Sequence, residues 1–289
     1  MFKKKKDQTY QSYWSISWNI FKKNKVAMVC LFIVILLCLI ALFAPLIAPY
    51  DPNKQVLTDR LMKPCGQHWF GTDDLGRDIF SRIIYGCRVS LSVGIISQII
   101  ATVIGYTMGV CAGYFGGKVD SVISFLIQVF SSFPFLLFAM AIMFVLGPGL
   151  INLYLALGLL GWASTARLIR GDVMRLKKME YIDACKVSGG NSFRIIMKHL
   201  LPNCLSTLIV TVTLGIPSAI MSEASLSFLG LGVKAPMASW GSMISFSQPY
   251  IRSATYYSVI PGLAIIITVL AFNMLGDGLR DALDPKLRS

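Results

Sequence analysis

The chain has 289 residues, of which 55% are hydrophobic and only 14% charged, and its formal net charge is +13. Soluble domains usually carry about 25% charged residues, so this composition argues against a soluble globular protein and favours several membrane-spanning helices. The basic residues flank apolar runs, a pattern that fixes membrane topology and argues against nucleic acid as a partner. We therefore predict that the protein lies in a lipid bilayer.

Six segments contain the roughly 20 mostly apolar residues that a membrane-spanning helix needs. In chain order they are Val26–Ile47, Val89–Tyr114, Val122–Leu146, Leu150–Leu168, Cys204–Met221 and Tyr256–Leu275. The first has the basic start of a secretory signal, but its apolar run is too long and lacks a small-residue cleavage site. We therefore predict an all-α, polytopic membrane protein with about six transmembrane helices.

The distribution of lysine and arginine predicts the orientation. If the N-terminus lies inside, 19 of the 27 basic residues fall on inner segments and 8 on outer loops. An excess on the inside favours a protein with both termini in the cytoplasm. The predicted divisions are a basic cytoplasmic segment (1–25), the first span with an external loop (26–88), a five-span core (89–276) that contains a cytoplasmic loop (169–203), and a cytoplasmic tail (277–289).

The external loop contains a cluster of acidic and basic residues just before the second span. Three aspartates, Asp73, Asp74 and Asp78, could bind a hard cation through oxygen ligands. Their spacing is not that of a calcium-binding loop, however, and Arg77 and Arg82 are close enough in sequence to neutralise them. We expect a turn and salt-bridge network that shapes the external mouth of the protein.

The second span contains small residues at every fourth position. These are Ala101, Gly105, Gly109 and Gly113, which would form a stripe along one face of a helix. Such a stripe lets a second helix approach closely. The favoured partner is another helix of the same chain, and the alternative is a helix of another subunit.

A long polar stretch, Glu180–Asn203, lies between the fourth and fifth predicted spans. Residues Glu180–Ser188 are expected to form a short helix, which ends because Gly189 accepts the left-handed conformation at a helix C-terminus. Asn191 can cap a second helix, and Pro202 marks the entry to the fifth span. The stretch is long and polar enough for a soluble protein to bind it.

One face of that first short helix consists of small residues. Ala184, Cys185, Ser188 and Gly189 fall within an arc of about 140° at 100° per residue, and Asp183 and Lys186 flank them. The backbone of another protein could approach this face closely. The alternative is a helix that rests on the bilayer surface.

The fifth span carries two residues with a potential role in a translocation path or outer gate. Glu223 lies at its outer end in apolar surroundings, where an ionisable group is costly and suggests a function. It could pair with a substrate amine or with Lys234 or Arg252, or it could simply face water. Pro217 lies inside the apolar run, and a proline kink of this kind suits a helix bundle that moves.

The sequence contains no pattern typical of catalysis, of a metal site or of a bound cofactor. Gly113–Lys118 is only faintly similar to a phosphate loop, because Val119 stands where serine or threonine is needed. Cys65 and Cys87 both look external, so a disulfide between them is an open alternative. The chain is expected not to be an enzyme, and any ATP chemistry is expected in a partner.

The polar stretch resembles the cytoplasmic signature loop of ABC importer permeases. The family pattern is Glu-Ala-Ala, three residues, Gly, nine residues, Ile, any residue and Leu-Pro. Here it reads Asp183-Ala184-Cys185, then Gly189, then His199 in place of Ile, and finally Leu201-Pro202. Three longer segments, His68–Gly94, Ser222–Trp240 and Leu275–Arg288, are similar to the dipeptide, oligopeptide and nickel branch, in particular to the second of its two paired permeases.

The resemblance implies a type I ABC importer permease in a bacterial cell membrane. It further implies a homologous second permease, two ATPase subunits and an extracytoplasmic substrate-binding protein as partners. In this family the signature loop contains the coupling helix, which docks on the ATPase. The matching residues of this chain are Asp183, Ala184, Cys185, Gly189, Leu201 and Pro202. The substrate class implied is dipeptides or oligopeptides, with nickel or a metal chelate as the alternative.

Two rival functions belong to other classes, a secondary transporter or channel and a membrane scaffold. A secondary transporter usually needs ionisable groups near the middle of its spans, and the six segments have essentially none there.

Overall fold

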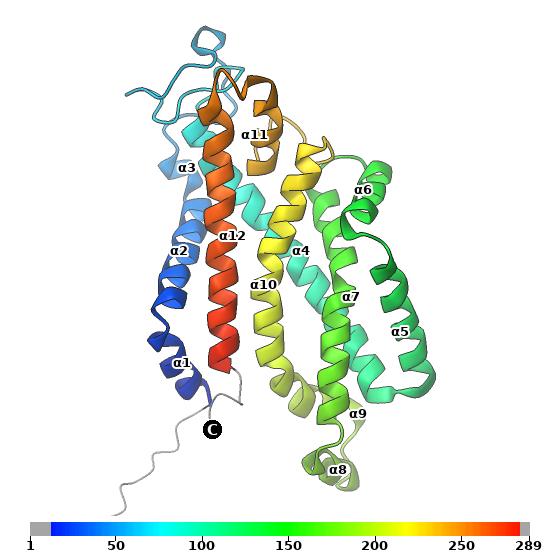
Figure 1. Ribbon diagram of the computed structural model, residues 1–289. Helices are drawn as coiled ribbons and strands as arrows, with labels where there is room; N and C mark the ends of the chain where they lie inside the picture. The colour runs from blue at the N-terminus through cyan, green and yellow to red at the C-terminus, as the bar shows by residue number, and fades with distance from the viewer. Residues whose placement is uncertain (1–12, 284–289) are drawn as a thin grey trace, which may run out of the picture.

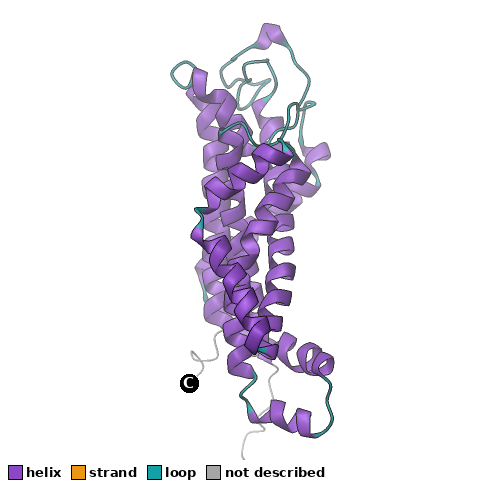
Figure 2. Ribbon diagram, turned by 90° about the vertical axis from the view of Figure 1, so that its right-hand side faces the viewer, coloured by secondary structure: helices purple, strands orange, loops and turns teal. Residues whose placement is uncertain are grey.

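A computed structural model describes residues 13–283 of the chain, and its regular elements are helices arranged in one elongated bundle (Figures 1 and 2). They are α1 (Tyr13–Lys23), α2 (Lys25–Leu42), α3 (Ala44–Ile47), α4 (Ile79–Phe115), α5 (Gly117–Ser132), α6 (Phe135–Leu146), α7 (Leu150–Leu176), α8 (Glu180–Val187), α9 (Ser192–Ile195), α10 (Leu201–Phe228), α11 (Trp240–Ser247) and α12 (Thr255–Leu283), with short helical turns at Leu57–Asp59, Ile196–Leu200 and Gln248–Tyr250. The loop 48–78 and α11 cover one end of the bundle, which we call the capped end, and α8 lies at the opposite end, the α8 end (Figure 1).

All six predicted spans fall on helices. Among residues 13–283, four helical stretches are long and apolar enough to cross a membrane: Lys25–Leu42, Ile79–Phe115, Ser192–Phe228 and Thr255–Leu283. Helices α5 and α6 meet at 90° and provide a fifth span only if they act together. The remaining expected span, in α7, is less apolar because it contains Asn152 and Arg167 besides its apolar residues.

The third predicted span, Val122–Leu146, is broken instead of continuous. Pro134 separates α5 from α6 and has no backbone N–H to continue a helix. A tight turn at residues 147–149 joins α6 to α7: Gly147, with φ +79°, ends α6, and α7 starts at Leu150. The α5–α6 pair therefore bends at the middle, which exposes phenylalanine side chains on both sides of the proline.

Three helices extend beyond the predicted boundaries. Helix α4 begins at Ile79 instead of Val89, because Asp78 caps it by accepting a hydrogen bond from the backbone N–H of Ser81 at 2.7 Å. Helix α7 continues to Leu176, and α12 continues to Leu283 with Gly278, Ala282 and Leu283 buried. The predicted boundary after residue 88 therefore lies inside a helix, and the predicted tail from 277 starts as helix; residues 1–12 and 284–289 lie outside the described part of the chain.

The small-residue stripe of α4 packs against α7 of the same chain. An added Cβ atom on Gly105, Gly109 or Gly113 would lie 2.6, 2.7 or 2.9 Å from its nearest neighbour, and all these neighbours belong to α7. Gly161 of α7 faces Ala101 in the same way, at 3.1 Å. The intramolecular alternative is thus confirmed, and α4 with α7 forms the tightly packed core of the bundle.

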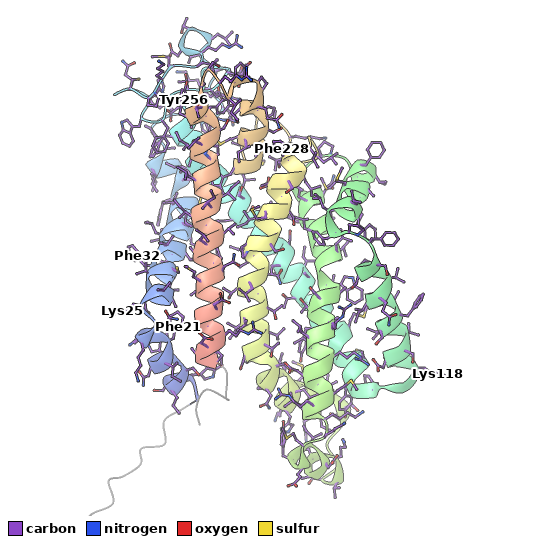
Figure 3. All side chains as sticks on the ribbon, viewed as in Figure 1. Phe21, Lys25, Phe32, Lys118, Phe228 and Tyr256 are labelled. Atoms are coloured by element: carbon purple, nitrogen blue, oxygen red, sulfur yellow. The ribbon has the colours of Figure 1, made fainter. Side chains whose placement is uncertain are left out.

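Apolar side chains cover much of the outside of the bundle. Phe32 on α2 is 66% exposed and points away from the neighbouring helices (Figure 3). Exposed leucine, isoleucine and valine side chains continue along α2 and α12. A surface of this kind suits hydrocarbon and not water, because helices satisfy their own backbone hydrogen bonds and present apolar side chains to lipid.

Candidate functional site

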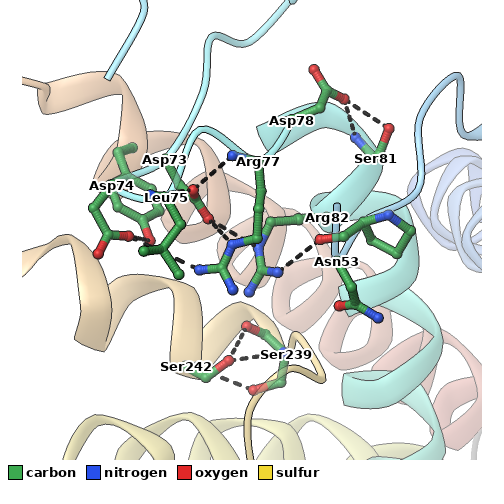
Figure 4. Close-up of polar contacts among 12 residues, drawn as sticks. Asn53, Asp73, Asp74, Leu75, Arg77, Asp78, Ser81, Arg82, Ser239 and Ser242 are labelled. Atoms are coloured by element: carbon green, nitrogen blue, oxygen red, sulfur yellow. Dashed lines mark hydrogen bonds and ion pairs between the residues drawn. The ribbon is translucent and has the colours of Figure 1, made fainter. Parts of the chain in front are cut away.

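An ion-pair network built around Asp73 holds the capped end together (Figure 4). Asp73 is completely buried and pairs with Arg77 at 2.6 Å and with Arg82 at 3.5 Å. Its carboxylate also accepts hydrogen bonds from the backbone N–H groups of Leu75 and Arg77, both at 2.9 Å. The predicted turn and salt-bridge network is confirmed, and the carboxylate of Asp73 is occupied by cationic and N–H donors.

The neighbouring acids tie this network to other elements. Asp74 accepts a hydrogen bond from the Tyr257 hydroxyl of α12 at 3.2 Å. Asp78 caps α4 and lies 2.9 Å from the His68 ring, so it links the loop to the start of that helix. Arg82 donates to the carbonyl of Pro52 at 2.9 Å. The capped end is therefore one connected polar structure above the apolar bundle.

Glu223 belongs to α10 and is buried among hydroxyl groups. It has 0% exposed surface and accepts hydrogen bonds from Ser227 at 2.6 Å and from Ser90 of α4 at 3.3 Å. Ser90 in turn accepts from the backbone N–H of Trp240 at 3.3 Å. This placement corrects the prediction for Glu223: it does not face water, and hydroxyls instead of Lys234 or Arg252 are its partners. Glu223 joins α4, α10 and α11.

A cavity of about 910 Å³ opens between α4, α7 and α10, beside the break between α5 and α6. Its lining mixes apolar with neutral polar side chains, and includes Ser97, Gln98, Phe133, Phe135, Ser164, Thr207, Thr211 and Ser218. Two arginines also line the cavity, Arg175 in the last turn of α7 and Arg280 in the last turn of α12. Both helices finish toward the α8 end (Figure 1). Pro217 and Glu223, which were predicted for a path or gate, are buried in α10 and do not line this cavity, although Ser218 beside Pro217 does.

The polar lining of this cavity was not predicted from the sequence. Ser97 and Gln98 are adjacent polar residues near the middle of a long apolar run, and Thr207 and Thr211 are one helical turn apart in another. These polar residues within apolar runs were the signal in the sequence that could have indicated a polar cavity lining. Hydroxyl groups are common in membrane helices, however, and only the tertiary arrangement shows that these residues share one cavity.

At the opposite end, α8 presents the predicted small-residue face. Asp183, Ala184, Ser188 and Gly189 are exposed, whereas Cys185 is half-buried with its Sγ 3.4 Å from Nε2 of His199. Gly189 has φ +78° and ends the helix, as predicted. Asp183 pairs with Lys186 at 2.7 Å on the surface.

A single apolar residue anchors α8 to the bundle. Ile182 is fully buried and packs in a cluster that includes Ile195, Leu200 and Val173. Asn191 caps the following helix, as predicted, by accepting from the Arg194 N–H at 2.8 Å. That helix does not stop before Pro202, however: it continues through a π-helical turn into α10, because proline is tolerated in the first turn of a helix. Leu201 and Pro202 thus lie in the first turn of α10, within the helical segment that follows α8.

The structure leaves Cys65 and Cys87 as free thiols. Cys65 is exposed in the loop 48–78, whereas Cys87 is buried in α4 with its Sγ 3.5 Å from the carbonyl oxygen of Leu37. The disulfide left open by the sequence is therefore absent, because Cys87 lies inside the helix bundle and not in the external loop.

Comparisons with known proteins identify the family. The sequence model of the "binding-protein-dependent transport system inner membrane component" matches residues 102–289, and that of the "N-terminal TM domain of oligopeptide transport permease C" matches residues 12–64. The chain belongs to this family of binding-protein-dependent inner membrane transport components. Its long α4, its polar loop around α8 and its bundle of apolar helices are thus those of a multi-pass membrane protein.

Three curated relatives cover nearly the whole chain. It is 46% identical to the dipeptide transport system permease protein DppC of Bacillus subtilis, over 96% of this chain and 87% of the relative. It is 42% identical to the oligopeptide transport system permease protein OppC of the same species, over 96% and 91%. It is 41% identical to the glutathione transport system permease protein GsiD of Pectobacterium atrosepticum, over 98% and 95%.

The fold is also that of a solved transporter. A chain of the MetNI methionine ABC transporter, crystallised in an inward-facing conformation, matches with a TM-score of 0.57 and 19% sequence identity. The match covers 71% of this chain and 98% of that chain. The predicted type I ABC importer permease fold is confirmed by this likeness.

Proposed function

We propose that this chain is the membrane-spanning permease subunit of an ABC importer that carries short peptides. Three relatives that align along nearly the whole chain are named for dipeptides, oligopeptides and glutathione, which are all short peptides. The observation that carries the proposal is the cavity between α4, α7 and α10, where uncharged hydrogen-bonding groups such as Ser97, Gln98 and Thr211 lie between apolar side chains. A peptide needs both, because its backbone is polar and its side chains vary.

We also propose that α8 and the residues around it couple the permease to an ATPase. Ala184, Ser188 and Gly189 form an exposed small-residue surface, with Cys185 at its edge and the exposed Asp183 beside it. Small side chains let a partner approach closely, and the buried Ile182 transmits a displacement of α8 to the bundle. Leu201 and Pro202 support the loop from the start of α10. ATP hydrolysis would take place in the partner.

The proposed orientation places the α8 end in the cytoplasm of a bacterium and the capped end outside. The described chain starts and ends, at α1 and α12, near the α8 end (Figure 1), and the excess of lysine and arginine also favours that end. The proposed partners are a homologous second permease beside the cavity, two ATPase subunits against α8, and an extracytoplasmic substrate-binding protein above the loop 48–78.

In the proposed cycle, ATP binding draws the two ATPase subunits together and moves α8 with them. The helix bundles then rotate as rigid bodies between a state that opens to the cytoplasm and a state that opens to the outside. ATP can drive this change because the two states of the ATPase bind the coupling loops differently.

The substrate is tested by uptake of labelled dipeptide, labelled tetrapeptide and labelled nickel in cells with and without the gene. Loss of peptide uptake alone supports the peptide importer, and the length preference separates dipeptides from oligopeptides. Loss of nickel uptake alone would instead assign the protein to metal import.

Coupling is tested at Gly189. A tryptophan there should reduce peptide uptake about tenfold or more while the protein still inserts, because a bulky side chain blocks the close approach of the ATPase. Gly147→Trp is the matched control, since Gly147 also has a positive φ and open space around it but lies at the capped end. Equal uptake in the two variants would rule out docking at Gly189.

A further inference from the structure

Ser97 and Gln98 are adjacent residues near the middle of α4, and both line the cavity. The hydroxyl oxygen of Ser97 is buried, with the residue only 1% exposed, and it has no hydrogen-bond partner among the described residues. A buried polar atom without a partner is costly, and such atoms are rare in native structures. Ser97 lines the cavity, and a change of its side-chain rotamer would bring the hydroxyl to a ligand there.

Gln98 has unused hydrogen-bonding capacity at the same place. Its Nε2 donates weakly to the Thr102 hydroxyl at 3.3 Å and to the Thr211 carbonyl of α10 at 3.5 Å. An amide offers two donor hydrogens and an acceptor oxygen, and its Oε1 accepts no hydrogen bond from the described residues. Both contacts are near the long limit for a hydrogen bond, so a better partner can replace them.

Gly215 of α10 provides the space for the Gln98 amide. A Cβ atom at this position would collide with the end of the Gln98 side chain. Gly215 also lines the cavity and lies near the middle of α10, so the amide is held between the middles of two spanning helices. The close approach has a cost, because glycine in the middle of a helix is destabilising relative to alanine.

The electrostatics of the cavity favour a neutral ligand at this level. Its middle is lined by hydroxyl, amide and apolar side chains, while the arginines Arg175 and Arg280 lie toward the α8 end. An amide group matches Ser97 and Gln98, because its N–H can donate to Ser97 Oγ or Gln98 Oε1 and its carbonyl can accept from either residue.

We infer that Ser97 and Gln98, with Gly215, form a subsite that binds the main-chain amide of a peptide as it crosses the membrane. The inference rests on the proposed peptide transport and deepens it. Hydrogen bonds to the main chain are independent of side-chain identity, so a subsite of this kind would accept peptides of varied sequence.

Substitutions test the subsite in cells that carry the complete transporter. The double variant S97A/Q98L removes the hydrogen-bonding groups at nearly unchanged volume, and it should lower the maximal rate of dipeptide uptake about tenfold, since two hydrogen bonds are lost. The dipeptide concentration at half-maximal uptake should stay the same, because the binding protein captures the peptide first. Gly215→Ala, which displaces the Gln98 amide, should act in the same direction. Thr107→Val is the control, because Thr107 lies on α4 outside the cavity and bonds its own helix at Val103.

A photoreactive dipeptide with a diazirine side chain provides a direct readout. Illumination during uptake should attach it near residues 97–98 and 211–215, and S97A/Q98L should reduce that attachment. Normal uptake by S97A/Q98L, or attachment only elsewhere, would overturn the subsite while peptide import still stands. Loss of uptake together with loss of the second permease from the purified complex would show that the residues serve assembly, and would equally overturn it. Absence of peptide uptake in the unaltered protein would instead refute the proposed function itself.

Discussion

At the scale of single residues, Asp73 forms ion pairs with two arginines, more than any other acid in the described part of the capped end. It is completely buried between two arginines, and Arg77 and Arg82 are themselves buried. Buried ions are costly to remove from water, and they are stable only when the opposite charges and hydrogen bonds are in place. The network therefore fixes the loop 48–78 in one arrangement over the start of α4.

Replacement of Asp73 by asparagine should destabilise the protein strongly. Asparagine keeps the shape but leaves the buried Arg82 without its ion-pair partner and Arg77 with only Asp74, at 4.0 Å. Removal of one partner of a buried ion pair typically costs about 3–5 kcal/mol. Thermal unfolding of the purified protein in detergent measures the effect. Asp183→Asn is the control, because Asp183 and Lys186 form an exposed pair whose contribution is at most about 1 kcal/mol. A similar melting temperature for both variants would contradict the central role of Asp73.

At the scale of elements, the pair α4 and α7 depends on glycines that have no room for a side chain. The atoms nearest to Gly109 are the Ala166 carbonyl oxygen and the Cβ of Ile169, which are backbone and near-backbone atoms that cannot rotate away. Lipid supplies no hydrophobic drive for helices to associate, so close packing of this kind largely holds them together. The regular spacing along α4 is thus a feature of stability.

Gly109→Leu should separate α4 from α7 and destabilise the bundle by about 1–3 kcal/mol or more, the usual cost of overpacking. Resistance to heat and to protease in detergent is the measurement. Gly171→Ala on α7 serves as the control, because nothing lies within 4 Å of an added Cβ there and alanine favours helix by up to about 1 kcal/mol. If Gly109→Leu behaved like Gly171→Ala, the packing interpretation would be wrong.

At the scale of the whole molecule, the two ends of the bundle differ in a way that labelling can detect. Cys65 is exposed in the loop 48–78, and Val187 at the end of α8 is 90% exposed. A membrane-impermeant maleimide should label Cys65 in intact cells when the other six cysteines are replaced by serine. A Val187→Cys variant that lacks all seven natural cysteines should be labelled only after the membrane is permeabilised.

This experiment tests the proposed orientation. Labelling of Val187→Cys in intact cells would place α8 outside, which would exclude a cytoplasmic ATPase as its partner. If Cys65 reacted only after permeabilisation and not in intact cells, the capped end would lie in the cytoplasm, opposite to the proposed orientation. The arrangement of α1 and of the end of α12 near the α8 end (Figure 1) makes the proposed topology self-consistent.

The sequence by itself determined the features that depend on local pattern. Apolar runs located the helices, glycine spacing indicated the packed face of α4, and Asn191 and Gly189 marked the ends of short helices. The alternating charges around Asp73 predicted an ion-pair network. These predictions hold because helix formation, capping and turn formation depend on neighbouring residues.

Only the tertiary structure decided which distant residues meet. Glu223 is buried among hydroxyls of α4 and α10, and the Trp240 N–H of α11 bonds one of these hydroxyls. Gln98 and Thr211, from two separate spans, line one cavity. Sequence spacing carries no information about the separation of two spans, because close contact between helices is set by side-chain packing in three dimensions.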